Sequence, residues 1–72
     1  MRKLSELNVG ESSEILEFSD LDIALKLVEL GCIPGESVRL EQLAPLGCPA
    51  IYRVGQQLLS IRKAEAEQII VK

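Results

Sequence analysis

The sequence contains no histidine and no tryptophan, and Phe18 and Tyr52 are its only aromatic residues. Without histidine, a Ser-His or Cys-His nucleophile pair cannot be assembled, and the commonest metal ligand is missing. The two cysteines, Cys32 and Cys48, are too far apart in the sequence to form a CxxC motif. These absences predict a chain that is not an enzyme, has no metal site and needs no cofactor.

Positive charge is also scarce. The chain has eight Lys and Arg residues against eleven Asp and Glu residues, which gives a formal net charge of −3. A surface that binds nucleic acid needs a basic stripe to release counterions, and aromatic side chains on which bases stack. The basic residues here are mostly scattered singly among acids, so we expect no nucleic-acid partner.

Long hydrophobic runs are absent as well. The N-terminal segment has two basic residues but no apolar run behind them, which is unlike a signal peptide. The longest apolar stretch, Ile23 to Ile33, contains Lys26 and Glu29 and is too short to span a bilayer. We therefore expect a cytoplasmic protein without membrane insertion, in which both cysteines stay reduced.

What the chain does hold is aliphatic side chains, since 47% of its residues are hydrophobic. A chain of 72 residues supports only one core, so residues 1–72 are expected to form a single domain. Domains of this size have a net stability of roughly 3 to 5 kcal/mol. Nearly every apolar position must then serve the core, and little remains to enclose an active site.

Alternation of apolar and polar residues predicts strands at residues 11–18, 36–43, 50–54, 57–62 and 69–71. A helix is expected over residues 21–30, and a short turn around Leu4 and Leu7 precedes the first strand. Residues 63–68 favour one helical turn. The order predicts a mainly β fold, a small five-stranded SH3-like barrel with one α-helix inserted after the first strand and a short helical turn before the last.

The predicted helix carries clear end signals. Ser19 and Asp22 have the spacing of a capping box, and Gly31 can take the left-handed conformation that ends a helix. The charged residues Asp22, Lys26 and Glu29 lie on one face of this helix, and a broad apolar stripe that we expect to face the core lies on the other. The stripe consists of Leu21, Ile23, Ala24, Leu25, Leu27, Val28 and Leu30.

A loop with two prolines and a glycine follows the second strand. Loops on a rigid barrel carry recognition at low cost to the core, and Leu46 is an apolar side chain at the loop tip. Leu58 and Ile70 lie opposite the predicted inward positions of their strands, although the barrel's own helix could cover them. The candidate protein-binding residues are Pro45, Leu46, Gly47, Cys48, Pro49, Leu58 and Ile70.

Each cysteine allows two interpretations. Cys32 follows the helix-ending glycine, where an apolar residue packs back on the last turn near Leu27, so burial is favoured over a metal or redox role. Cys48 lies in the loop and is expected to be exposed. A single thiolate there falls short of the three or four ligands of a structural metal site.

The runs LVELGCIPGESVRLEQLAPLGCPAIYRV and LLSIRKAEAEQIIV resemble the FeoA family, small cytoplasmic accessory proteins of bacterial ferrous iron uptake. The resemblance covers nearly the whole chain. The chain departs from the family pattern at Cys48, where an acidic residue is common, and at Cys32, where an aliphatic residue is usual. It rests on Leu30-Gly31 with Pro34-Gly35, on Ala44-Pro45-Leu46-Gly47 with Pro49, and on Leu59, Ile61, Arg62, Ala66, Ile69 and Val71.

The resemblance implies an SH3-like barrel without enzymatic activity, related to the C-terminal barrel of DtxR-type repressors. It also implies a partner, the FeoB membrane iron transporter with its GTPase domain. Homo-oligomer formation stays open. For a GTPase partner, Arg39, Arg53 or Arg62 could act in trans on phosphate charge, although arginine on the outside of a strand is usually solvated surface.

Two further functions remain as alternatives. One is an intracellular transition-metal sensor or regulatory domain that uses Cys32, Cys48 and a carboxylate such as Glu36. The other is recognition of proline-rich peptides, which the shortage of aromatic residues argues against.

Overall fold

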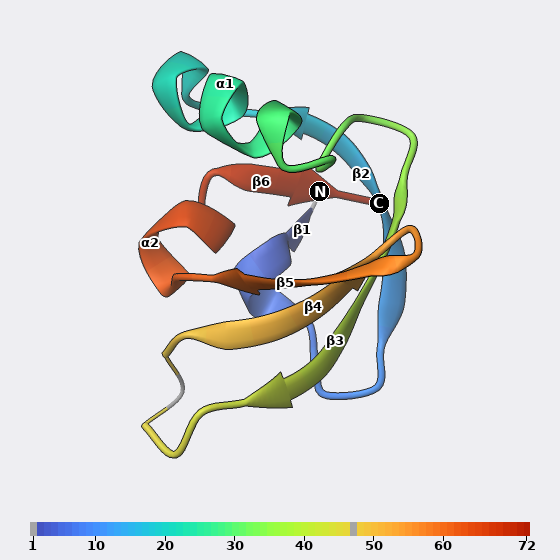
Figure 1. Ribbon diagram of the computed structural model, residues 1–72, viewed down its shortest axis with the longest axis vertical. Coiled ribbons are helices and arrows are strands. Elements are labelled where there is room, and N and C mark those ends of the chain that lie inside the picture. Colours follow the sequence, from blue (N-terminus) through green and yellow to red (C-terminus); the bar gives the residue numbers. More distant parts are fainter. Residues whose placement is uncertain (1, 47) are drawn as a thin grey trace.

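In the computed structural model, residues 2–46 and 48–72 are described, and within them six strands form one antiparallel sheet in the order β1-β6-β2-β3-β4-β5 (Figure 1). The predicted mainly β class is confirmed, with one more strand than expected. The elements in chain order are β1 (Arg2–Lys3), the 3-10 helix η1 (Leu4–Glu6), β2 (Ser12–Phe18), α1 (Leu21–Glu29), β3 (Ser37–Leu43), β4 (Ala50–Val54), β5 (Gln57–Ile61), α2 (Lys63–Ala66) and β6 (Ile69–Val71).

The sheet curls because β2 pairs with two different strands along its length. Its first residues pair with β3 and its later residues pair with β6. Irregularities in register occur between Ile15 and Glu17 and, on β3, between Leu40 and Gln42. Such bulges bend a strand and increase its twist, which lets a small sheet fold around one core. In Figure 1, β2 accordingly runs along the right-hand side, from the bottom of the molecule to α1.

The core is mainly aliphatic, as predicted, and Tyr52 is the one aromatic residue among its buried side chains. Among the residues that the structure describes, no polar or charged side chain is buried, and each main element except β1 contributes at least one apolar side chain. The buried residues are Leu4, Leu7, Ile15, Leu27, Cys32, Val38, Leu40, Ala50, Tyr52, Val54, Ile61, Ala66, Ile69 and Val71.

The predicted cap of α1 is wrong. Asp20 is the N-cap, and its side chain accepts a hydrogen bond from the backbone N–H of Ile23 at 3.0 Å. Ser19 is instead engaged with Gln68, whose backbone C=O accepts from the Ser19 N–H at 2.8 Å. The serine continues the β2–β6 pairing, so the adjacent aspartate takes the capping role.

The expected burial of the apolar stripe on α1 is confirmed only in part, since Ile23 is half-buried against the core but several stripe residues are exposed. Leu27 is fully buried, whereas the exposed fractions are 75% for Leu21, 60% for Leu25 and 45% for Val28. α1 crosses one end of the sheet in Figure 1 and presents only a narrow face to the core. Over residues 2–46 and 48–72, no helix has the length and apolar character that crossing a membrane requires.

The predicted end of α1 is confirmed. Gly31 has a φ of +96°, the left-handed conformation that favours glycine. Directly after it, the backbone N–H of Cys32 donates to the C=O of Leu27 at 2.9 Å, and the Cys32 side chain is fully buried. The cysteine therefore packs on the last turn of the helix, as expected.

Candidate functional site

The β3–β4 loop over residues 44–49 projects from one end of the molecule. Its base is closed by a hydrogen bond of 3.2 Å from the backbone N–H of Ala44 to the C=O of Pro49. Leu46 is 95% exposed, and Pro45, Cys48 and Pro49 are also exposed. Gly47 lies outside the described residues. The predicted exposure of the loop is confirmed, and its binding role stays a prediction.

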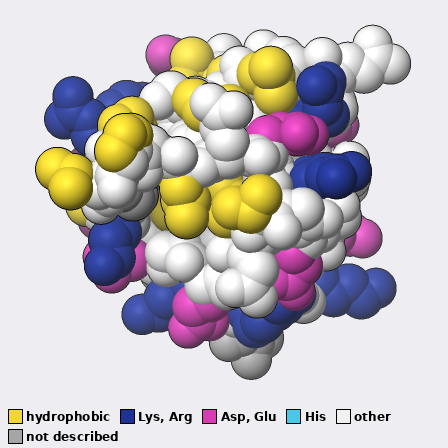
Figure 2. Space-filling view, turned by 90° about the horizontal axis from the view of Figure 1, so that it is seen from below, with side chains coloured by type: hydrophobic (Ala, Val, Ile, Leu, Met, Phe, Trp, Pro, Cys, Tyr) yellow, Lys and Arg dark blue, Asp and Glu magenta, His cyan; other side chains and the backbone are white. Residues whose placement is uncertain are grey.

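The loop forms part of a wider apolar surface. Figure 2 shows hydrophobic side chains gathered at this end of the molecule, with charged groups placed mainly around them. Leu43, at the end of β3, is 49% exposed, and Val9, in the turn before β2, is 57% exposed. Hydrophobic side chains that cluster in this way favour contact with another protein.

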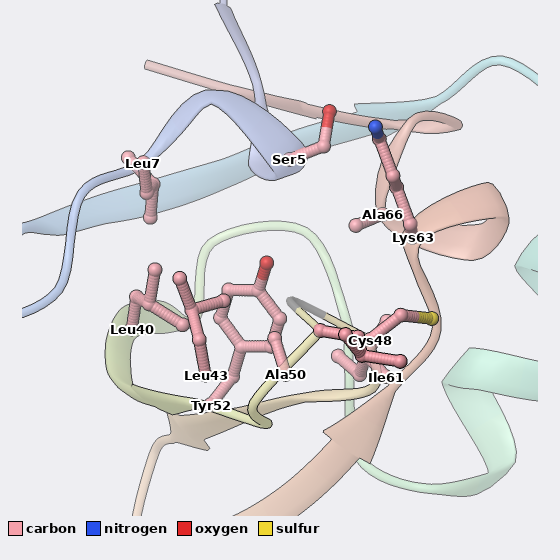
Figure 3. A pocket seen from close by; sticks show the side chains of 11 residues that line it. Ser5, Leu7, Leu40, Leu43, Cys48, Ala50, Tyr52, Ile61, Lys63 and Ala66 are labelled. Carbon is pink, nitrogen blue, oxygen red and sulfur yellow. The ribbon is translucent and has the colours of Figure 1, made fainter.

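Behind the loop lies a pocket of about 250 Å³ (Figure 3). Leu7, Leu40 and Leu43 line one side, while Cys48 and Ile61 lie on the other. The Tyr52 ring lies in the middle, and burial raises the pKa of its hydroxyl. The full lining is Ser5, Leu7, Leu40, Leu43, Leu46, Cys48, Ala50, Tyr52, Ile61, Lys63 and Ala66.

The structure does not bring Leu58 and Ile70 to the loop. Leu58 is 54% exposed and pairs with Arg53, near the turn at the far end of the β4–β5 hairpin. Ile70 is half-buried on β6, a strand that β2, β3 and β4 separate from β5 in the sheet. The candidate residues therefore occupy three separate places, of which the loop has the most exposed side chain.

The basic residues of the sheet differ in their partners. Arg53 and Arg39 both lie beside the Glu41 carboxylate, with Nε to Oε2 distances of 3.1 and 3.9 Å. Arg62 forms no ion pair within the part of the chain that the structure describes. A role for an arginine in trans on a GTPase stays a prediction, and Arg62 is the residue least engaged elsewhere.

The two cysteines lie in contrasting environments. Cys32 is buried and Cys48 is exposed, and neither forms a disulfide. Burial raises the pKa of the Cys32 thiol to about 11. In the ranges 2–46 and 48–72, no three side chains of the metal-binding types lie close enough together to hold an ion. The ligand set of the sensor alternative is therefore not brought together there.

This contrast predicts selective thiol chemistry. At about pH 8, iodoacetamide should modify Cys48 in the folded protein and leave Cys32 unmodified, because roughly one Cys32 thiol in a thousand is ionised at that pH and the side chain is inaccessible. Mass spectrometry before and after adding denaturant measures both sites. Cys48→Ser should show no fast modification. Fast labelling of Cys32 in the folded wild type would show that its thiol is not buried.

A family model described as the FeoA domain matches residues 2–72. The chain belongs to the FeoA family. A curated relative, the Fe(2+) transport protein A/Fe(2+) transporter FeoB fusion protein of Porphyromonas gingivalis, is 31% identical over 71 residues. The match covers 97% of this chain and only 8% of that protein. FeoA proteins are transport accessory proteins and not a known family of enzymes.

Solved FeoA structures share the fold. Iron(II) transport protein A of Clostridium thermocellum is 36% identical with a TM-score of 0.91, covering 99% of this chain and 44% of that one. FeoA of Stenotrophomonas maltophilia, a prokaryotic SH3 domain protein complexed with zinc, is 34% identical with a TM-score of 0.85, covering 100% and 91%. The predicted SH3-like fold is thereby confirmed.

The expected kinship with metal-dependent repressors also holds at the level of the fold. IdeR of T. acidophilum is 20% identical with a TM-score of 0.82, and the match covers 99% of this chain and 33% of that one. The same small barrel therefore occurs both as a FeoA protein and as part of a larger repressor.

Proposed function

We propose that this FeoA chain is a non-enzymatic cytoplasmic accessory protein of ferrous iron uptake that binds and modulates a FeoB-type transporter. The main support for this proposal is a relative of this chain in which a FeoA protein and FeoB are fused in one polypeptide. Fusion keeps two modules at high effective concentration, so a separate chain needs a recognition surface to achieve the same association. The exposed β3–β4 loop supplies a candidate for that surface.

Uptake of radioactive ferrous iron by cells tests this function. Cells that lack this chain but keep FeoB should take up less ferrous iron, and expression of the wild-type chain should restore uptake. The matched control is a cell that lacks FeoB, in which the chain should have no effect. Unchanged uptake in cells that lack the chain, with FeoB present at its normal level, would contradict the proposal.

The loop surface leads to a specific prediction. Leu46→Asp should weaken binding to FeoB by about 1 to 2 kcal/mol, or roughly five- to thirtyfold in Kd, because a charge would replace the most exposed apolar side chain of the loop. The melting temperature should stay nearly unchanged, since Leu46 is 95% exposed. Isothermal titration of FeoB purified in detergent measures the affinity.

Leu21→Asp is a matched control for this experiment. Leu21 is 75% exposed at the start of α1, where an acidic side chain interacts favourably with the helix dipole. This variant should bind FeoB like the wild type. A Leu46→Asp variant that is fully folded and binds as tightly as the wild type would place the docking surface elsewhere.

A further inference from the structure

The strand β5 leaves one edge of its backbone free. It pairs with β4, and no described strand lies on its other side. A turn of two residues joins the strands, so Val54 and Gln57 form the first hydrogen-bonded pair and alternate residues of β5 then bond toward β4. The backbone N–H and C=O of Leu58 and Ser60 therefore point away from β4. Within residues 2–46 and 48–72, none of these groups has another hydrogen-bond partner.

A groove of about 460 Å³ runs beside this edge, between the end of β5 and α1. Two contacts fix the position of α1 across it. The Gln57 Nε2 donates to the backbone C=O of Leu30 at 3.1 Å, and the Lys26 ammonium pairs with the Glu65 carboxylate of α2. The lining residues are Lys26, Leu27, Leu30, Pro49, Ser60, Arg62 and Glu65.

The edge and the groove together define the shape of an occupant. Unpaired strand N–H and C=O groups are satisfied best by another extended backbone, as in peptide recognition by strand addition. Leu30 on α1 and Ser60 on β5 line the same groove, so α1 stands beside the free edge. A second sheet would meet this helix, whereas a single extended segment needs only the width of one further strand, about 4.8 Å. A second copy of this chain paired sheet to sheet is thereby disfavoured.

The side chains of the groove define the chemistry of the occupant. Leu30 is 44% exposed and supplies an apolar wall, which favours an apolar side chain on the incoming segment. The Lys26 charge is balanced by Glu65, and the Lys26 side chain holds the pKa of that carboxyl below its usual value. Arg62 is exposed and forms no ion pair with any described residue. An acidic side chain opposite Arg62 complements this end of the groove.

We infer that the edge of β5 and the groove beside α1 bind one extended segment of FeoB, with an apolar and an acidic side chain, as an additional strand of the sheet. The inference rests on the proposed function and names how the partner is recognised. Pro49 lines the groove and also belongs to the β3–β4 loop, so strand and loop form one continuous surface. Backbone bonds along β5 give affinity, and the groove side chains give selectivity.

Ser60→Pro tests the inference because proline removes one outward N–H without removing a bond to β4. Proline is tolerated at such edge positions. Ser60→Ala is the matched control, since it keeps the N–H. We expect Ser60→Pro to weaken binding to detergent-purified FeoB at least about tenfold, while Ser60→Ala stays within about twofold of the wild type. Circular dichroism verifies that both variants are folded.

A second measurement covers the case in which the proline variant does not fold. In the wild type, hydrogen exchange at the amides of Leu58 and Ser60 should be fast in the free chain and strongly slowed in the complex with FeoB. Equal binding by folded Ser60→Pro, or unchanged exchange at both amides in the complex, would overturn the inference alone. Absence of wild-type binding to FeoB would overturn the proposed function and this inference with it.

Discussion

Leu27→Ala is expected to lower the free energy of unfolding by about 2 to 5 kcal/mol, the usual cost of truncating a buried leucine. Leu27 is 1% exposed and is the one fully buried side chain of α1. Since domains of this size have a net stability of roughly 3 to 5 kcal/mol, much of the variant should be unfolded at room temperature. Urea denaturation followed by circular dichroism measures the change.

Leu25→Ala provides the matched control for this experiment. It makes the same chemical change on the same helix, but Leu25 is 60% exposed. Its stability should stay within about 0.5 kcal/mol of the wild type. Equal effects of the two substitutions would show that α1 does not present its Leu27 face to the core.

Gly31→Ala is expected to cost about 2 kcal/mol, or a fall in melting temperature of about 8 to 16 °C. The φ of Gly31 is +96°, which costs an L-residue roughly 1 to 2 kcal/mol. A Cβ at this position would also lie 2.5 Å from Gln57 Nε2. The glutamine side chain can move away, but it would then lose its hydrogen bond to the C=O of Leu30.

Two further variants separate the cost of the left-handed backbone at Gly31 from the cost of the contact between its added Cβ and Gln57. Gly35 has a φ of +95° and nothing within 4 Å of an added Cβ, so Gly35→Ala reports the strain alone. In a Gln57→Ala background, Gly31→Ala should cost about as much as Gly35→Ala, because the contact is already gone. A melting temperature unchanged by Gly31→Ala would contradict the observed end of α1.

The strands could be predicted from the sequence where several neighbouring residues show which side chains face the core. The predicted bounds of β4 and β6 are those observed, because every second residue of each strand is buried. β1 was missed since two residues are too few to show any period. It exists because Arg2 pairs with Val71 at the other end of the chain.

The buried face of α1 could not be predicted from the sequence. Nine residues with several leucines predict a helix correctly, but the face that it buries depends on the angle at which it meets the sheet. Ser19 and Asp20 are both good capping residues. The β2–β6 pairing, a contact between distant parts of the sequence, decides that Asp20 takes the cap.

The candidate site was predictable only in part. An apolar residue between two prolines in a loop has few places to be buried, so the exposure of Leu46 follows from the sequence. The groove along β5 does not, because Leu30 and Ser60 become neighbours only when α1 crosses the end of the sheet. The resemblance to FeoA proteins, and not the physics of the residues, supplied the expected partner.

Docking on FeoB is tested most directly by a calorimetric titration of detergent-purified FeoB from the same organism with the folded wild-type chain, with and without GTP. We expect saturable binding that Leu46→Asp weakens and Leu21→Asp does not. If the folded chain shows no saturable binding to active FeoB in either nucleotide state, this FeoA protein does not work by docking on the transporter.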